Sequence, residues 1–245
     1  MDVRLQKLID THESIVFFGG AGVSCESGIP DFRGTDGLYH QTYRYPPEEI
    51  LSHHFFEEQP EEFFRFYRDK MLYPDAKPNA AHLALARWEQ AGKLRAVVTQ
   101  NIDGLHQAAG SKNVLELHGS VHRNHCMRCG AFYALDDILR ILSAGGVPRC
   151  TCGGVIKPDV VLYEEALDSA TMDAALRAIH AADMLIVGGT SLNVYPAAGL
   201  LRYFAGDALV VINKTPTPAD RNADLVIQDA IGVVMREGEP TPAAP

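Results

Sequence analysis

A short apolar run that leads directly into a glycine-rich turn constrains this chain more than any other feature. The run is residues 15–18 (IVFF), and residues 20–34 (GAGVSCESGIPDFRG) follow it. A strand that ends in such a turn is typical of the place where a doubly wound sheet binds a nucleotide. We expect Gly20 and Gly22 to permit a positive φ and to let backbone N–H groups approach a phosphate. The glycines alone would fit equally well a tight strand-to-helix turn without a ligand.

The turn also departs from the dinucleotide fingerprint G-x-G-x-x-G, because its third glycine would fall at Cys25. Pro30 argues against a long uninterrupted helix after the turn, so residues 27–34 are expected to form an ordered loop that can fold over a ligand. Two interpretations of Cys25 stay open. It is either a thiol whose pKa a helix N-terminus lowers, or a small packing residue.

Composition and charge exclude several classes of protein. Of the 245 residues, 47% are hydrophobic and 22% are charged, and no apolar run is long enough to span a bilayer. Residues 1–7 carry no basic stretch before an apolar block, so we expect no secretory signal and a cytoplasmic location. The formal net charge of −9 gives no electrostatic reason to bind nucleic acid and mildly favours basic partners such as lysine-rich segments.

Short β-branched blocks recur along the chain, with helical patterns between several of them. The blocks are residues 15–18, 96–98, 114–115, 160–162, 184–187 and 209–212, and the helical patterns are residues 5–9, 80–90, 174–182 and 197–204. Alternating strands and helices predict a mostly parallel sheet that is covered on both faces. The predicted fold class is therefore α/β, with a doubly wound parallel sheet.

Two stretches interrupt this alternation and are interpreted as insertions that form a smaller module. Residues 46–73 are rich in aromatic and charged side chains at helical spacing, and residues 122–154 hold four of the five cysteines. The predicted division is a large domain of residues 1–35, 74–121 and 155–236, and a small domain made of a helical insert (36–73) and a cysteine module (122–154). Residues 237–245 have the composition of a disordered tail.

The four clustered cysteines predict a structural zinc site. Cys126 and Cys129 form one close pair, Cys150 and Cys152 form the other, and 20 residues separate the pairs. This spacing suits one tetrahedral Zn²⁺ with four thiolates, which leaves no open position for water. Two disulfides are the alternative, which a reducing cytosol disfavours. The second pair is C-x-C where C-x-x-C is usual, so it needs a tighter turn, which the glycines at 153 and 154 can supply.

Polar side chains also gather at the ends of predicted strands, where open α/β sheets bind ligands. Residues 99–106 (TQNIDGLH) follow one strand and His118 follows another, and residues 188–193 (GGTSLN) and Asn213 mark two further strand ends. The polar run within residues 99–106 could be a turn with an Asx cap for the following helix. Such a turn would explain Asn101 or Asp103 but hardly the whole run. His118 suits general-base chemistry, although a lone histidine is more often structural.

Together these segments resemble the sirtuins, the NAD-dependent protein lysine deacylases, of the bacterial type. The match covers nearly the whole chain and rests on G-A-G-V-S with S-G-I-P-D-F-R-G, T-Q-N-I-D-G-L-H, H-G, the four-cysteine module, K-P-D-V-V-L-Y-E-E, G-T-S-L-N-V-Y-P-A and V-V-I-N. The resemblance implies a Rossmann-like domain plus a small domain of zinc ribbon and helical insert. NAD, the co-substrate, and an acetyl-lysine protein or peptide would meet in the cleft.

The resemblance also implies a role for individual residues. His118 would be the general base and would contact the cofactor, and Asn101 would be the second catalytic residue. The NAD pocket would be lined by Ala21, Cys25, Phe32, Arg33 and Gln100. The nicotinamide and its ribose would be surrounded by Asn101, Ile102 and Asp103. The adenosine end would be held by Thr190, Ser191, Asn213, Asp229 and Ala230. Val161, Tyr163 and Val194 would bracket the acyl-lysine, with the peptide added as a strand between residues 160–164 and 193–195.

The implied reaction removes an acetyl group from lysine and gives nicotinamide, O-acetyl-ADP-ribose and free lysine. Cys25 stands where threonine is usual, and Glu164 replaces the glycine of the family's F-G-E, which bears on how the peptide strand fits. The Y-x-x-R pair that binds carboxylated acyl chains is absent after Tyr67, so acetyl is the expected substrate and Arg68 the one cation that could rescue a succinyl group. The alternatives are an ADP-ribosyltransferase or NAD hydrolase on the same cleft, and a non-catalytic NAD-sensing module.

Overall fold

The computed structural model describes residues 1–31 and 44–236. Phe32 and Arg33, the start of the predicted helical insert and the predicted tail 237–245 lie outside the described residues. No helix in the two described stretches is long and apolar enough to cross a membrane.

A six-stranded parallel sheet forms the larger part of the molecule and confirms the predicted fold class. Its order is β3-β2-β1-β7-β8-β9, which corresponds to the 3-2-1-4-5-6 order of doubly wound folds. The strands are β1 (Ile15–Gly19), β2 (Leu94–Thr99), β3 (Val114–Glu116), β7 (Met184–Gly188), β8 (Ala208–Ile212) and β9 (Leu225–Ile227). The strand order reverses between β1 and β7, so the turns after these two strands flank the crevice where such sheets bind ligands.

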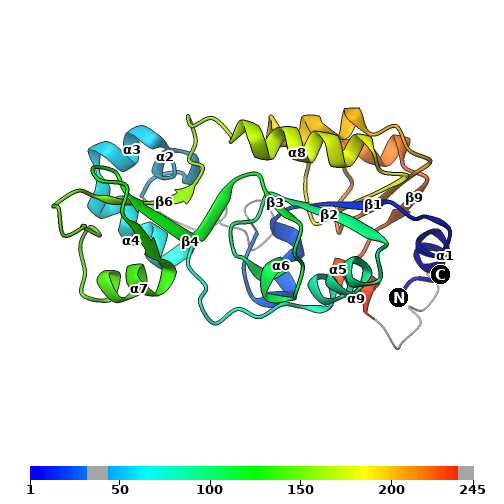
Figure 1. Cartoon of the computed structure of the whole chain (residues 1–245), viewed down its shortest axis with the longest axis horizontal. Helices are drawn as coiled ribbons and strands as arrows, with labels where there is room; N and C mark the ends of the chain where they lie inside the picture. Colours follow the sequence, from blue (N-terminus) through cyan, green and yellow to red (C-terminus); the bar gives the residue numbers. More distant parts are fainter. Residues whose placement is uncertain (32–43, 237–245) are drawn as a thin grey trace.

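Helices cover both faces of this sheet because its strands are buried on both sides (Figure 1). Phe17 faces a cluster with α1 (Val3–Thr11), α5 (Ala80–Gln90) and α9 (Ile231–Met235). Phe18 faces the opposite cluster, with α8 (Ser169–His180) and the 3₁₀ segment η4 (Ala197–Tyr203). The period of two in a strand explains why neighbouring phenylalanines pack into different layers. The helical pattern at 197–204 is thus a 3₁₀ segment.

The smaller module has its own sheet and its own core (Figure 1). Its antiparallel sheet is ordered β5 (Phe132–Ala134), β4 (Gly119–Cys126), β6 (Ile156–Val160). Around it lie α2 (Pro47–Ile50), α3 (His53–Glu58), α4 (Pro60–Lys70) and α7 (Leu135–Ser143). Aromatic rings of α3 and α4 form the centre of the core, for example Phe56 edge-on to Phe63 with centroids 5.1 Å apart.

Two predicted features differ in the structure. The apolar block 160–162 is no strand of the parallel sheet, because β6 ends at Val160 and pairs antiparallel with β4. Its burial alternates, as expected for a strand with one covered face. The prediction also missed β9, a short strand at the sheet edge. The division into domains stays a prediction, although β4 runs across the proposed boundary at 121/122 and β6 pairs with the small sheet.

Candidate active site

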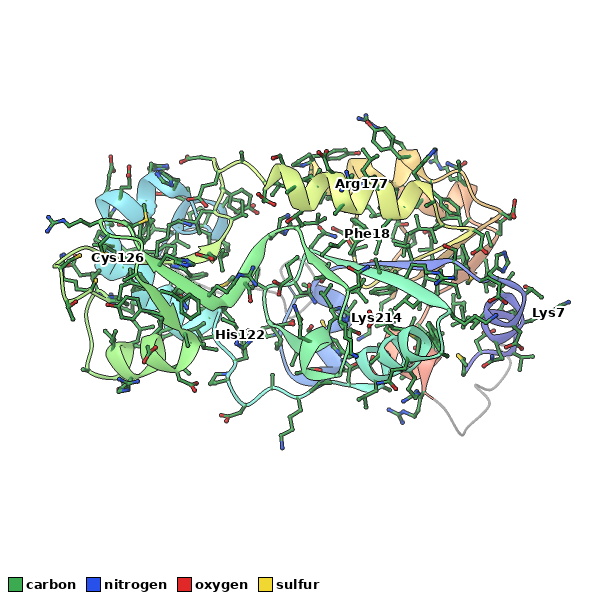
Figure 2. The ribbon with its side chains drawn as sticks, in the orientation of Figure 1. Lys7, Phe18, His122, Cys126, Arg177 and Lys214 are labelled. Atoms are coloured by element: carbon green, nitrogen blue, oxygen red, sulfur yellow. The ribbon has the colours of Figure 1, made fainter. Side chains whose placement is uncertain are left out.

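A cleft of about 1610 Å³ separates the large sheet from the small module and holds the predicted site residues. It is lined by the turns that follow β1, β2, β3, β7 and β8, together with residues of the small module. Of the predicted residues in the described parts of the chain, all line it: Ala21, Cys25, Gln100, Asn101, Ile102, Asp103, His118, Val161, Tyr163, Thr190, Ser191, Val194, Asn213, Asp229 and Ala230. In Figure 2, His122 and Lys214 lie near the middle of the molecule, and both line this cleft.

The glycine-rich turn is built for close packing and not for a left-handed backbone. Gly20 has φ −137° and Gly22 is not among the glycines with positive φ, so that expectation was wrong; Gly28, at φ 85°, is the left-handed residue of the turn. A Cβ on Gly22 would lie 2.8 Å from the Cα of Gly189, and one on Gly20 would lie 2.9 Å from the Cβ of Thr190. The turn after β1 therefore packs against the turn after β7, which leaves no room for a side chain at either position.

Two 3₁₀ turns follow, η1 (Ala21–Val23) and η2 (Cys25–Ser27), and no long helix. Cys25 is half-buried, and its Sγ lies 3.7 Å from the carbonyl oxygen of Ala21. Burial raises the pKa of the Cys25 thiol, and the negative charge of Asp31 adds to this effect. A three-residue 3₁₀ turn has no substantial dipole to oppose the rise. The interpretation of Cys25 as an activated thiol was wrong, and the packing interpretation fits.

Three polar side chains that line the cleft are joined by hydrogen bonds. The amide Nδ2 of Asn101 donates to Ser24 Oγ (3.0 Å), and Ser24 Oγ donates to Asp103 Oδ2 (2.6 Å). Asp103 Oδ1 also accepts from the N–H of Leu105 (2.9 Å), so Asp103 forms an Asx turn, although the N-cap of the helix that follows is Gly104. Asn101 caps nothing and is only 8% exposed. Ser24 was not among the predicted site residues, and its place in the G-A-G-V-S segment was the one signal for it.

His118 is held in the protonation state that a general base needs. Its Nδ1 lies 3.1 Å from the carbonyl oxygen of Gln100. A carbonyl only accepts, so Nδ1 carries the hydrogen and Nε2 keeps its lone pair. Burial lowers the pKa of His118, against a smaller opposing effect of that hydrogen bond. The imidazole is therefore neutral at neutral pH and can take up a proton at Nε2.

Gly119 fixes the direction of the chain beside this histidine. It has φ 75°, and a Cβ there would collide with the carbonyl oxygen of Asp159. The chain can thus leave β3 and pair at once with β6. The carbonyl of His118 accepts from the N–H of Val161 (3.0 Å), which ties the histidine to the segment predicted to bind peptide.

The two polar strand ends on either side of β1 are joined directly. Gln100 Nε2, after β2, donates to Thr190 Oγ1 (3.1 Å), after β7. Further along the edge, Asn213 Nδ2 donates to the carbonyl of Thr215 (2.8 Å), and Asp229 Oδ1 accepts from the N–H of Ala230 (2.7 Å). Asn213 and Asp229 thus shape the loops at the far end of the cleft.

The lip of the cleft is the segment 161–165, which hydrogen-bonds to the small module. The N–H of Tyr163 donates to Leu51 (2.9 Å), and its carbonyl accepts from His53 (3.0 Å). Glu164 follows in a left-handed conformation, φ 76°, which costs about 1–2 kcal/mol in a residue other than glycine. Glu165 turns back and accepts from Lys157 Nζ (3.1 Å).

The cations of α4 lie differently from the expectation. Arg68 pairs with Asp69 (2.8 Å) and lines a separate groove with Glu61 and Leu142. Lys70, two residues further on, lines the cleft. Among the described cations of α4, Lys70 is therefore the one that could approach a carboxylated acyl group, because Arg68 does not line the cleft.

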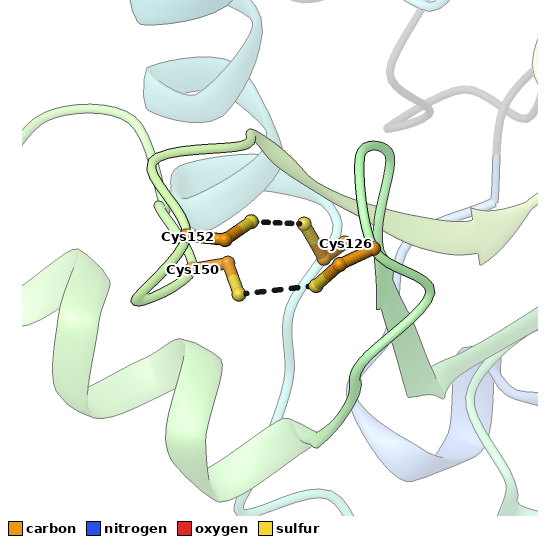
Figure 3. A group of neighbouring side chains, drawn as sticks. Cys126, Cys150 and Cys152 are labelled. Atoms are coloured by element: carbon orange, nitrogen blue, oxygen red, sulfur yellow. Dashed lines mark hydrogen bonds between the residues drawn. The ribbon is translucent and has the colours of Figure 1, made fainter.

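The four clustered cysteines fit one Zn²⁺ (Figure 3). Their ligand atoms all lie within 4.8 Å of one another, with Sγ–Sγ distances of 3.5 Å for Cys126–Cys152 and 3.6 Å for Cys129–Cys150. A disulfide needs about 2.05 Å, whereas four sulfurs at 2.3 Å from a tetrahedral zinc lie about 3.8 Å apart. The cluster therefore has the geometry of a closed, structural site, and the cysteines are free of disulfides.

The tight C-x-C turn is closed by the two glycines that follow it. The N–H of Cys150 donates to the carbonyl of Gly154 (2.8 Å), and Gly153 has φ 84°. A Cβ on Gly154 would lie 2.7 Å from Cys126 Sγ. Figure 2 places Cys126 at the end of the molecule away from the large sheet, so the zinc site supports the small module and takes no part in the cleft.

Comparison with known proteins adds to this geometry. The model of the family described as Sir2 matches residues 20–196. A protein of Clostridium acetobutylicum named NAD-dependent protein deacetylase is 59% identical over 235 residues, which is 95% of each chain. One of the same name from Clostridium perfringens is 60% identical over 236 residues, covering 95% of this chain and 96% of the relative.

Solved structures resemble this one over nearly its full length. A structure described as Sir2 with a p53 peptide and NAD⁺ has a TM-score of 0.85 and 39% identity, and each chain is covered to 95%. A structure described as Sir2 bound to an acetylated peptide has a TM-score of 0.84 and 38% identity, with 95% of this chain and 94% of the other covered.

Proposed function

The chain belongs to the Sir2 family, and we propose that it removes acetyl groups from protein lysine side chains with NAD as co-substrate. The observation that carries this proposal is the position of His118, which lines the cleft where the strand order reverses and, with Nδ1 3.1 Å from the carbonyl oxygen of Gln100, leaves Nε2 to act as a base. Relatives at 57–60% identity carry the name NAD-dependent protein deacetylase, and similar structures hold NAD⁺ or an acetylated peptide.

The residues of this chain would divide the work as follows. Bound NAD would supply an electrophilic ribose carbon, to which the acetyl oxygen bonds as the bond to nicotinamide breaks and nicotinamide leaves. The side-chain amide of Asn101 is fixed by its hydrogen bond to Ser24 and would face the nicotinamide end of NAD. The hydrogen bond between Gln100 and Thr190 joins the turn after β2 to the turn after β7, at the crevice where the strand order reverses. His118 takes a proton from a ribose hydroxyl at Nε2, which lets that oxygen take over the acetyl group.

The rest of the cleft would bind the ends of the two substrates. The adenosine end of NAD would lie against Thr190, Ser191, Asn213, Asp229 and Ala230. Val161, Tyr163 and Val194 would enclose the acyl-lysine with apolar walls, and the peptide would lie along the lip. We further propose a cytoplasmic location and the two-domain division of the chain.

The alternatives share the cleft and differ in what happens to the ribose. In a hydrolase water, and in an ADP-ribosyltransferase an acceptor group, bonds to the ribose carbon as nicotinamide leaves, whereas deacetylation requires a base more strictly, to take a proton from a ribose hydroxyl. A sensing module would bind NAD and acetyl-peptide without turnover. His118, with its hydrogen on Nδ1 and its lone pair on Nε2, is ready to act as that base. This arrangement favours deacetylation over a hydrolase, an ADP-ribosyltransferase and a sensing module.

The test is to incubate the zinc-loaded protein with NAD and an acetyl-lysine peptide and to analyse the products by mass spectrometry. Deacetylated peptide, nicotinamide and O-acetyl-ADP-ribose in equal amounts are expected. A parallel reaction without peptide serves as the control for hydrolysis. Nicotinamide and free ADP-ribose in both reactions would replace the proposal with an NAD hydrolase, and ADP-ribosylated peptide would replace it with a transferase.

A further inference from the structure

Glu164 lies at the lip of the cleft in a conformation that its side chain explains. Its φ of 76° lies in the left-handed region, which a glycine would adopt without strain. The side chain reaches across to α3, where Oε1 accepts from His54 Nδ1 (2.7 Å) and Oε2 accepts from the His54 N–H (3.1 Å). The carboxylate is thus held in one place and still lines the cleft.

This carboxylate keeps both its charge and its access to a ligand. The hydrogen bonds from the His54 N–H and side chain hold the pKa of Glu164 below its usual value, so the group is ionised at neutral pH. Its side chain is 50% exposed. Each carboxylate oxygen can accept two hydrogen bonds, and His54 uses one on each, so acceptor sites remain for a second donor.

The neighbouring acid differs in this respect. Glu165 accepts from Lys157, His53 and the N–H of Leu162, and its side chain is 21% exposed. Lys157 neutralises it locally. Glu164 therefore carries the negative charge that this lip segment presents to the cleft.

We propose that Glu164 selects substrates, so that the enzyme favours acetyl-lysines that are flanked by arginine or lysine. The inference rests on the proposed deacetylase function, in which Tyr163 lies beside the acyl-lysine. Glu164 is the next residue along that segment, with its Cα about 3.8 Å from that of Tyr163, and it lines the same cleft, so its carboxylate comes near a peptide side chain one or two positions from the acetyl-lysine. A guanidinium there gains a charge-assisted hydrogen bond, and a carboxylate there is repelled.

The test uses acetyl-lysine peptides that differ at single flanking positions. Arginine, alanine or glutamate is placed at each of the two positions on either side, and kcat/KM is measured for each peptide. At the position that faces Glu164, arginine is expected to exceed glutamate by about fivefold to tenfold, the effect of an exposed ion pair set against a like-charge contact. Raising the salt concentration to 0.5 M should reduce the ratio, because exposed charges are screened.

Three variants assign the preference to this residue. Glu164→Gln should bring the arginine-to-glutamate ratio close to one, and Glu164→Lys should invert it. Glu13→Gln is the matched control, since it also removes one carboxylate but lies at the amino end of β1, opposite the cleft; it should keep the wild-type ratio. These ratios compare peptides on one protein, so a change in folding or zinc content does not move them.

The outcomes separate this inference from the proposed function. Turnover of all peptides without a preference, or a preference that survives in Glu164→Gln and Glu164→Lys, would overturn the role of Glu164 and leave the deacetylase proposal standing. Absence of turnover for every acetyl-peptide, with NAD present and zinc bound, would instead overturn the proposed function and this inference with it.

Discussion

Acid should destabilise this protein through two histidines buried behind the cleft. His82 on α5 and His106 on α6 (Leu105–Ala108) are 0% and 1% exposed, and their rings lie 4.7 Å apart. Within residues 1–31 and 44–236, His82 Nε2 and both ring nitrogens of His106 have no hydrogen-bond partner. Burial lowers the pKa of His106 to about 3 and that of His82 to about 4, from 6.5, since a charged imidazole cannot be solvated there.

The sign and size of the effect follow from these values. Between pH 6.5 and 4 the unfolded chain protonates both histidines and the folded chain neither, so stability is lost as the pH falls through this window. One pKa unit corresponds to about 1.4 kcal/mol, so each histidine lowers the free energy of unfolding by about 2 kcal/mol at pH 5. Two such losses are a large part of the about 5–15 kcal/mol that stabilises a typical domain.

The assay is urea unfolding at pH 7, 6 and 5 of the wild type and of His106→Phe. Phenylalanine keeps a ring against Phe17 and has no group to protonate, so the loss between pH 7 and 5 should shrink by about 2 kcal/mol. His180→Gln, which changes an exposed histidine on α8, is the matched control and should lose as much as the wild type. The reasoning is refuted if folded His106→Phe loses as much stability as the wild type.

Three further predictions concern the metal, the glycine turn and the acyl group. Cys126→Ala should lose the zinc, about one per chain by metal analysis, and melt the small module, because binding free energy there is folding free energy; a zinc-free protein that stays folded and active would contradict this. Gly22→Ala should raise the KM for NAD at least about tenfold, because a Cβ would press on the backbone of Gly189. Gly28→Ala, with open space around it, should cost about 1 kcal/mol of stability and little NAD affinity. Equal KM values for the two variants would refute the packing argument. The kcat/KM for an acetyl-lysine peptide should exceed that for a succinyl-lysine peptide by on the order of a hundredfold, because burying an unpaired carboxylate costs several kcal/mol. Succinyl turnover that equals acetyl turnover and is lost in Lys70→Ala would instead show that Lys70 pairs with the succinyl carboxylate.

The fold could be predicted well where the signal is local. The run at 15–18, the blocks at 184–187 and 209–212, and the helix at 80–90 each carry their own periodicity, and the structure has elements at all four places. The block at 160–162 was predicted to join the parallel sheet, but only Val160 lies in a strand, at the end of β6 in the small sheet, because the partner of a strand is a non-local property that a short block does not encode. The 3₁₀ form of residues 197–203 is likewise decided by packing on the sheet.

The site could be predicted as a set of residues and less well as a set of contacts. Strand ends brought Asn101, Asp103 and His118 together, because the carboxyl ends of parallel strands share one edge. The positive φ expected at Gly20 and Gly22 was wrong, since sequence does not distinguish a left-handed backbone from a close approach, whereas the expected approach to a phosphate stays a prediction. Ser24 was missed because its partners lie 77 and 79 residues away along the chain.

The central claim is that His118 serves the deacetylation step and is not needed for loss of nicotinamide. The most direct test measures two reactions in one mixture of NAD, acetyl-lysine peptide and labelled nicotinamide: exchange of label into NAD and formation of O-acetyl-ADP-ribose. We predict that His118→Ala, folded and zinc-loaded, loses O-acetyl-ADP-ribose by about a hundredfold or more while exchange persists. Near-native O-acetyl-ADP-ribose from this variant would contradict the account.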